Sequence, residues 1–88
     1  MGYHKRDISR GEYGEFSKIE EEFYEALDGM EQRNPVLVLV ELSDLIGAIE
    51  GYVNAHFSLS LDDIIKMKEA THRAFWDGTR QPRSERVV

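Results

Sequence analysis

Apolar side chains recur every three or four residues over the first third of the chain. They are Tyr13, Phe16, Ile19, Phe23, Ala26, Leu27 and Met30. This spacing follows the α-helical period and predicts a helix with one apolar face. Ser9 and Glu12 have the spacing of a capping box, and a glycine commonly follows the last turn of a helix. We therefore expect a first helix from Glu12 to Asp28 that ends near Gly29.

The next segment is apolar on nearly every face. After a short connection over residues 29–34, Asn34 can cap a helix and Pro35 suits its first position. We expect a second helix, antiparallel to the first, that reaches about Ala55. Its apolar residues are Leu37, Val38, Leu39, Val40, Leu42, Leu45, Ile46, Ile49, Tyr52 and Val53. A helix that is apolar all round is buried all round, and in 88 residues only a second subunit can supply that cover.

Small residues gather on the side of this helix opposite Leu42 and Ile46. They are Gly47, Ala48, Gly51 and Ala55. A glycine inside a helix costs about 1 kcal/mol relative to alanine. The two glycines therefore indicate that another helix approaches closely on this side.

A third helix is predicted from Ser60, where Asp63 completes a second capping pattern, to a stop at Gly78. Its apolar face comprises Leu61, Ile64, Ile65, Met67 or Lys68, Thr71, Phe75 and Trp76. No segment has the pattern of a strand. The predicted fold class is all-α: an antiparallel helical hairpin plus a third helix, completed as a helical bundle by dimerisation. We expect an N-terminal arm over residues 1–11, a helical domain over 12–78 and a basic tail over 79–88.

The composition narrows the class of protein. A chain of 88 residues makes one domain with a marginal core, and the absence of cysteine excludes disulfides and thiolate metal sites. No run approaches the ~18 apolar residues of a membrane helix, and the N-terminus has no signal-peptide pattern. We expect a cytoplasmic protein without a membrane partner. A formal net charge of −6 argues against a nucleic acid duplex as partner.

Two pairs of acidic residues stand out. Glu22 and Glu25 are one helical turn apart on the first helix, and Glu41 and Asp44 repeat this step on the second. An antiparallel hairpin places the two pairs opposite each other. Carboxylates brought together resist ionising, and a hard divalent cation with oxygen ligands removes this penalty. The pattern predicts a Mg²⁺ site, with Mn²⁺ as a possible substitute, and Glu21 or Glu25 as the carboxylate that orients an attacking water.

A purely structural interpretation of the acids competes with this one. Glutamates at this spacing on the first helix alone are typical of a solvated face, and salt bridges to Lys18 or Arg33 would satisfy the other pair. Glu41 and Asp44, however, are among the few polar residues of a segment that otherwise requires burial. Because buried acids are rare unless paired or ligating, we favour the metal site.

At this point the motif resembles a known family. Residues 21–25 (EEFYE), followed after fifteen residues by residues 41–44 (ELSD), resemble the Glu-Glu-x-x-Glu … Glu-x-x-Asp signature of the MazG family of all-α nucleoside triphosphate pyrophosphohydrolases. Lys18-Ile19 and residues 45–49 (LIGAI) look like the short MazG-like proteins of phages and bacteria. The similarity covers roughly residues 16–75.

The resemblance implies an activity. It implies Mg²⁺-dependent hydrolysis of an NTP or dNTP to NMP or dNMP and pyrophosphate, in control or cleansing of a nucleotide pool in the cytoplasm of a bacterial or phage-infected cell. It also implies a homodimer, sometimes paired into tetramers. By motif position the metal ligands would be Glu22, Glu25, Glu41 and Asp44, with Glu21 as an adjoining acid. It leaves open the preferred base, the sugar and the residue that orients the water.

Other polar residues are weaker candidates. The substrate-binding candidates are Lys18, Asn54, Lys68 and Arg73, with Arg80 as a further basic residue. Lys18 can contact a phosphate or form a structural salt bridge, and Asn54 can contact a base or sugar or serve the helix end. Tyr13, Phe16, Tyr52 and Trp76 can stack on a base, although core packing is their commoner role. No role is assigned to His4, His56 or His72. The competing function is a non-catalytic helical dimer that binds a nucleotide or a protein.

Overall fold

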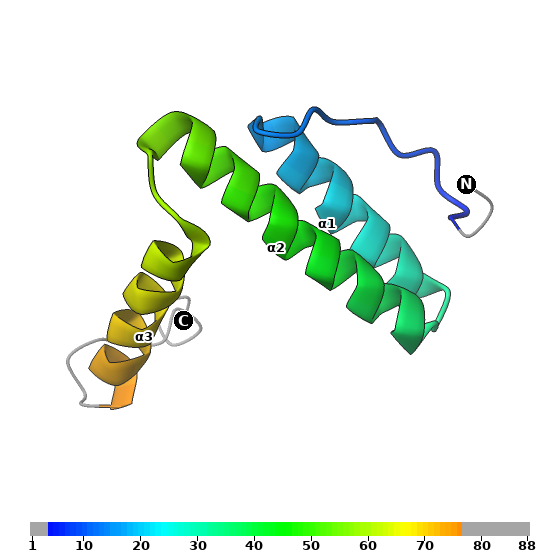
Figure 1. The fold of residues 1–88 in the computed structure, drawn as a ribbon. Helices are drawn as coiled ribbons and strands as arrows, with labels where there is room; N and C mark the ends of the chain where they lie inside the picture. Colours follow the sequence, from blue (N-terminus) through cyan, green and yellow to red (C-terminus); the bar gives the residue numbers. More distant parts are fainter. Residues whose placement is uncertain (1–3, 77–88) are drawn as a thin grey trace, which may run out of the picture.

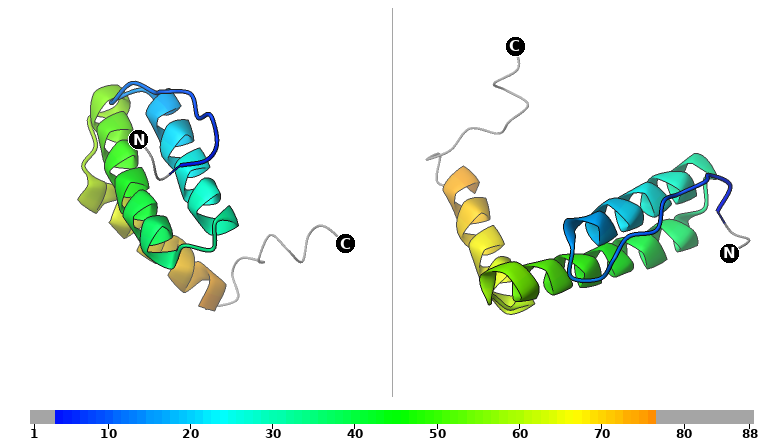
Figure 2. Two further views of the ribbon diagram at one scale, coloured as in Figure 1. Left: turned by 90° about the vertical axis from the view of Figure 1, so that its right-hand side faces the viewer. Right: turned by 90° about the horizontal axis from the view of Figure 1, so that it is seen from above.

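Three α-helices and no strand make up the part of the chain that the structure describes. The computed structural model describes residues 4–76, with the backbone alone for residues 74–76. α1 (Phe16–Glu31) and α2 (Pro35–Phe57) form an antiparallel hairpin, and α3 (Leu61–Trp76) turns away at the far end of α2 (Figure 1). The N-terminal arm runs back along the hairpin (Figure 2). The all-α class and the hairpin agree with the prediction. The tail over residues 79–88, Arg80 and the helix stop at Gly78 lie outside the described residues.

The start of α1 was predicted wrongly. The helix begins at Phe16 with Glu15 as its N-cap residue, and the Ser9–Glu12 capping box does not form. Gly14 has a φ of +92°, which is incompatible with a right-handed helix, so the chain turns between Glu12 and Glu15 before the helix starts. The Ser17 hydroxyl accepts the Glu12 N–H at 3.1 Å. Tyr13, expected on the apolar face of the helix, instead belongs to the turn.

The end of α1 also differs from the prediction. α1 continues to Glu31, and the left-handed residue that follows it is Arg33, with a φ of +57°. Gly29 is a buried helical residue, not a stop. A Cβ atom built on Gly29 would lie 3.2 Å from the Leu37 side chain and 3.3 Å from the Val38 backbone nitrogen. The glycine therefore allows the start of α2 to pack closely against α1.

The caps of α2 and α3 follow the predictions. Asn34 precedes Pro35, and its side-chain oxygen accepts the Leu37 N–H at 3.1 Å. At α3 the Ser60 N–H donates to Asp63 at 2.9 Å, and the Asp63 N–H donates to the Ser60 hydroxyl at 3.1 Å. Each motif fixes a helix start within four consecutive residues, which is why the sequence alone reveals it.

Removal of the α2 cap gives a first testable prediction. Asn34→Ala is expected to lower the free energy of unfolding by about 1 kcal/mol, because the Leu37 N–H loses its partner. Chemical denaturation of both proteins measures this difference. The matched control is Asn54→Ala, since the Asn54 amide is exposed and donates only to the Glu50 carbonyl. A larger loss for Asn54→Ala than for Asn34→Ala would contradict the assignment of the cap.

The buried apolar core of the single chain is small. It contains Ala26, Leu37, Ala48 and Val53, whereas large apolar side chains of both hairpin helices are exposed. Those on α1 and α2 are Phe16, Phe23, Tyr24, Met30, Val36, Leu39, Val40, Leu42, Ile46 and Phe57. The chain itself therefore does not bury α2 all round. No helix within residues 4–76 has both the length and the apolar character to cross a membrane.

On the small-residue side of α2, part of the close approach comes from within the chain and not from a helix. Within the described chain the group nearest to Gly51 is the Tyr13 ring, since a Cβ atom built on Gly51 would fall 2.6 Å from the Tyr13 Cζ atom. Gly47 has no atom within 4 Å of a built Cβ. The close approach at Gly51 therefore comes from the turn before α1.

Candidate metal centre

Carboxylates from α1 and α2 meet across the hairpin. One oxygen each of Glu22, Glu41 and Asp44 lie within 4.8 Å of one another. Glu22 and Glu41 are 4% and 5% exposed, whereas Asp44 lies at the exposed edge of the cluster. The antiparallel return of α2 thus brings together three of the four predicted ligands in one group.

Glu25, the fourth predicted ligand, belongs to two neighbouring groups. It lies with Glu21 and Glu22 on α1, and with Glu41 and His4 across the hairpin, in each case with ligand atoms within 4.8 Å of one another. Glu41 therefore links Glu25 to the group that contains Asp44. All four predicted ligands form one continuous cluster.

Two oxygens of the cluster are buried without a hydrogen bond. They are Oε1 of Glu22 and Oε1 of Glu41. A buried carboxylate oxygen without a partner costs at least about 1–3 kcal/mol. A cation bound between the helices would give both oxygens a partner, so the donor set fits a metal ion.

Burial and mutual repulsion dominate the electrostatics of the cluster. Burial, together with the neighbouring carboxyl groups of Glu41 and Glu22, raises the pKa of Glu25 to about 8. Burial also raises the pKa of Glu22, although Lys18 opposes this. The pKa of Asp44 is raised by burial and by Glu41. Without a cation, the cluster resists carrying its full negative charge.

Lys18 forms an ion pair with Glu21 and Glu22 at the edge of the cluster. The Lys18 ammonium lies 3.0 Å from an oxygen of Glu21 and 3.0 Å from one of Glu22. The Gly11 N–H donates to the same Glu21 oxygen at 2.8 Å. Although burial opposes it, these two donors lower the pKa of Glu21. The predicted structural salt bridge of Lys18 exists, but it joins the α1 acids and not Glu41 or Asp44.

His4 is the site residue that sequence reasoning missed. Its Nδ1 atom lies 2.9 Å from Asp28 Oδ2, and its Nε2 atom lies 3.0 Å from Glu41 Oε2. Although burial opposes it, hydrogen bonds to Asp28 and Glu41 raise the pKa of His4. Contacts along the arm hold the ring in place: the Lys5 N–H donates to Asp28, and Arg6 pairs with Glu31 at 2.7 Å. A histidine in an aperiodic arm carries no local signal of this position.

A shallow hollow of about 390 Å³ opens beside the cluster. It is lined by Tyr13, Lys18, Glu22, Ser43, Asp44, Gly47 and Ala48. The Tyr13 ring is 66% exposed, and the open space at Gly47 extends the hollow along α2. The hollow therefore combines two predicted metal ligands, a lysine and an accessible aromatic face.

The other substrate-binding candidates lie apart from the cluster. Asn54 lines a second hollow, with Tyr13 and Gly51, beyond the Tyr13 ring. Lys68 and Arg73 line a hollow on α3, and α3 contacts α2 but not α1 within the described residues. A single chain therefore does not bring Lys68 or Arg73 to the acids.

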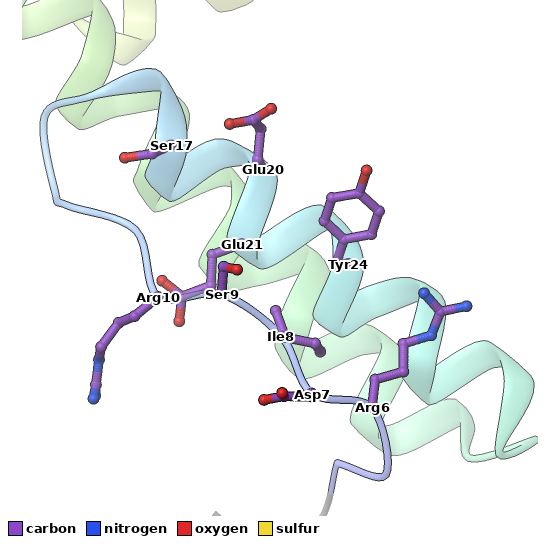
Figure 3. A pocket seen from close by; sticks show the side chains of 9 residues that line it. All are labelled: Arg6, Asp7, Ile8, Ser9, Arg10, Ser17, Glu20, Glu21 and Tyr24. Atoms are coloured by element: carbon purple, nitrogen blue, oxygen red, sulfur yellow. The ribbon is translucent and has the colours of Figure 1, made fainter.

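The arm and α1 enclose another pocket, of about 390 Å³ (Figure 3). Its lining comprises Arg6, Asp7, Ile8, Ser9, Arg10, Ser17, Glu20, Glu21 and Tyr24. Figure 3 shows Glu21 reaching toward the arm at Arg10 and Ser9. This pocket contains none of the four predicted metal ligands, whereas the hollow beside Asp44 contains two of them.

Comparison with known proteins adds no relative. No protein-family model, no curated protein and no solved structure matches the chain. The resemblance to the MazG family therefore stays a prediction based on the motif.

Proposed function

We propose that the chain is a magnesium-dependent nucleoside triphosphate pyrophosphohydrolase. It cleaves an NTP or dNTP between the α- and β-phosphates and releases pyrophosphate and the monophosphate. The observation that carries the proposal is the meeting of Glu22, Glu41 and Asp44 across the hairpin, with two buried carboxylate oxygens that lack a partner. The motif spacing and the resemblance to the MazG family support it further.

Glu22, Glu25, Glu41 and Asp44 would hold the cation. The donor set consists of oxygen atoms alone, which suits Mg²⁺, with Mn²⁺ as a substitute. When bound, the cation supplies charge compensation for the phosphates and lowers the pKa of an attacking water. The partly exposed edge at Asp44 leaves a side of the cluster open to the triphosphate.

Glu25 is the better candidate for orienting the attacking water. Glu21 already accepts two hydrogen bonds at Oε1, from Gly11 and Lys18, which hold it in the ionised form. Glu25 instead is half-buried where two groups of acidic side chains meet, one helical turn from Glu22. Glu25 can offer one oxygen to the metal and the other to the water.

The hollow beside the cluster would hold the nucleotide. Lys18 stands at its edge, with its side chain 27% exposed, and can extend from Glu21 and Glu22 to a phosphate. The Tyr13 ring offers a face for the base, and a stacked base gains about 1–3 kcal/mol from such a contact.

A homodimer would complete both the core and the site. The exposed apolar residues of the hairpin form a surface that a second copy would cover, as a chain this short requires. In such a homodimer, Lys68 and Arg73 of one subunit would contact the acidic cluster of the other. A cytoplasmic role in controlling or cleansing a nucleotide pool completes the proposal.

The apolar face of α2 gives a test of the dimer. Leu39 and Ile46 are 67% and 51% exposed in the single chain. The double variant Leu39→Glu/Ile46→Glu is expected to halve the mass found by light scattering, because charges replace apolar contacts at the interface. Arg10→Glu on the arm is the control, and its mass is expected to remain that of the parent. A parent protein that is monomeric at micromolar concentration would contradict the proposal.

The test of the activity is pyrophosphate release from a panel of ribo-, deoxy- and modified NTPs, with Mg²⁺ or with EDTA. Release that requires Mg²⁺ and leaves the monophosphate supports the proposal and ranks the substrates. A dimer that binds Mg²⁺ but turns over no NTP would favour the competing function, a non-catalytic module for a nucleotide or a protein. The observation in favour of that alternative is that Lys18 and His4 already pair with the acids.

A further inference from the structure

We propose that His4, Glu25 and Glu41 form a second cation position, one that takes Mn²⁺ or another first-row transition metal in preference to Mg²⁺. This proposal rests on the proposed function only in sharing Glu25 and Glu41 with the magnesium site. One nitrogen and two carboxylate oxygens, all within 4.8 Å of one another, supply the donor set.

The contacts of the His4 ring are compatible with those of a metal-binding histidine. Its Nδ1 atom faces Asp28 Oδ2 at 2.9 Å, and its Nε2 atom faces Glu41 at 3.0 Å and Glu25 at 3.7 Å. A metal-binding histidine usually donates its other ring N–H to a carboxylate, which fixes the tautomer and the ring orientation. Asp28 occupies that place here, and Nε2 points toward the two glutamates.

Asp28 is itself held firmly in this supporting place. It is 2% exposed. Besides His4, it accepts the Lys5 N–H at 3.1 Å and the Gln32 side-chain amide at 2.8 Å. No position of the MazG-like motif includes Asp28 or His4. The motif therefore gives neither residue a role in the magnesium site.

Glu41 has a further feature that points to a ligand here, and this position shares it with the magnesium site. Glu41 is 5% exposed, its Oε2 atom faces His4, and its Oε1 atom has no hydrogen-bond partner. The pairing with His4 thus leaves half of a buried carboxylate unsatisfied, and a cation would complete it. Because Glu41 also belongs to the group with Glu22 and Asp44, it would link the two cation positions.

The nitrogen donor determines the kind of metal. Mg²⁺ strongly prefers oxygen ligands, whereas imidazole together with carboxylate suits Mn²⁺ and the later first-row metals. The release of the Nε2 proton, or of one shared with Glu41, would accompany binding. The second position is therefore expected to fill with Mn²⁺ at concentrations at which Mg²⁺ does not occupy it.

Electron spin echo spectroscopy of the full chain with Mn²⁺ alone tests this site. The protein carries no polyhistidine tag, so that every imidazole signal comes from the chain. We expect nitrogen modulation from a coordinated imidazole in the parent protein, its loss in His4→Ala, and its retention in His56→Ala/His72→Ala, in which His4 is the only histidine left. The last variant leaves the cluster unchanged and keeps the test valid even if His4→Ala fails to fold.

Two results would overturn the proposal: bound Mn²⁺ without an imidazole signal in the parent, or a signal lost from the His56→Ala/His72→Ala variant. Its failure is distinct from that of the proposed function. NTP hydrolysis without nitrogen coupling would remove the second cation position alone. Nitrogen-coupled Mn²⁺ in a protein that hydrolyses no NTP would support this position and remove only the pyrophosphohydrolase.

Discussion

Glu41→Gln is expected to reduce magnesium-dependent pyrophosphate release by about 10³-fold, which corresponds to about 4 kcal/mol of transition-state stabilisation. Glu41 belongs to both residue clusters that span the hairpin, the one with Glu22 and Asp44 and the one with Glu25 and His4. One of its oxygens is buried without a hydrogen-bond partner. Glutamine keeps the shape of the side chain but offers the cation one neutral oxygen. The loss is therefore expected in turnover and in Mg²⁺ affinity together.

The matched control for this variant is Glu50→Gln, on the same helix. Glu50 is exposed and belongs to none of the three clusters of possible metal ligands described above. The control is expected to keep the parent rate. Equal rates for Glu41→Gln and the parent, with both proteins folded, would show that the acid cluster does not hold the catalytic cation. Circular dichroism and denaturation with EDTA present establish the folding of each variant.

The same substitution separates the two interpretations of the acids. If the cluster were a structural network held by His4 and Lys18, Glu41→Gln would mainly change stability and would leave Mg²⁺ without effect. If the cluster is a metal centre, the loss of one carboxylate donor would weaken Mg²⁺ binding, whatever the stability of the variant without metal. Mg²⁺ would then stabilise the parent but not the variant.

Local sequence signals predicted the elements of the fold that depend on a few neighbouring residues. Asn34 with Pro35 and Ser60 with Asp63 each act over three or four positions, and the structure confirms both caps. The start of α1 depended instead on the backbone of Gly14, whose positive φ overrides the helical period around it. A glycine is compatible with either conformation, so the pattern did not reveal this turn.

The residues of the candidate site also differ in whether local sequence signals predict where they lie. The proximity of the four acids could be predicted because a three-residue step on two helices joined by a short turn leaves few ways to arrange them. His4 could not be predicted, because 37 residues separate it from Glu41 and the arm has no period. The positions of Lys68 and Arg73 depend on where α3 lies relative to α1. The helical spacing of residues within each helix does not determine how two helices are placed relative to each other. The sequence did not reveal the locations of residues that are held in place by packing between distant segments.

In EDTA, the free energy of unfolding is expected to fall as the pH rises from about 5 to about 8. Glu25 keeps its proton in the folded chain until a pKa of about 8, owing to burial and to the carboxyl groups of Glu41 and Glu22. In the unfolded chain it loses the proton near its ordinary value, about 4.3. Between these values the unfolded state binds fewer protons, so stability declines with rising pH. One such group gives a slope of about 1 kcal/mol per pH unit.

The other groups with raised pKa values act in the same direction. The pKa of Glu22, raised by burial, and the pKa of Asp44, raised by burial and by Glu41, contribute stability that is lost as the pH rises. The pKa of His4 is also raised, by Asp28 and Glu41 against the effect of burial. Its contribution is fully present below about pH 6.5 and is lost as the pH rises through the folded-state pKa. The lowered pKa values of Glu21 and Asp28 act only at more acidic pH.

Denaturation series at several pH values, with EDTA or with Mg²⁺, measure this effect. Glu25→Gln is expected to flatten the decline in EDTA, because the substituted side chain does not titrate, whereas Glu50→Gln is expected to keep the slope of the parent. Mg²⁺ at pH 8 is expected to restore roughly 3 kcal/mol at a hundredfold excess over its Kd. Stability that rises between pH 5 and 8 in EDTA would contradict this account of the cluster. A decline that Mg²⁺ leaves unchanged would mean that the cluster binds no Mg²⁺, since a bound cation would stabilise the ionised carboxylates of the folded state.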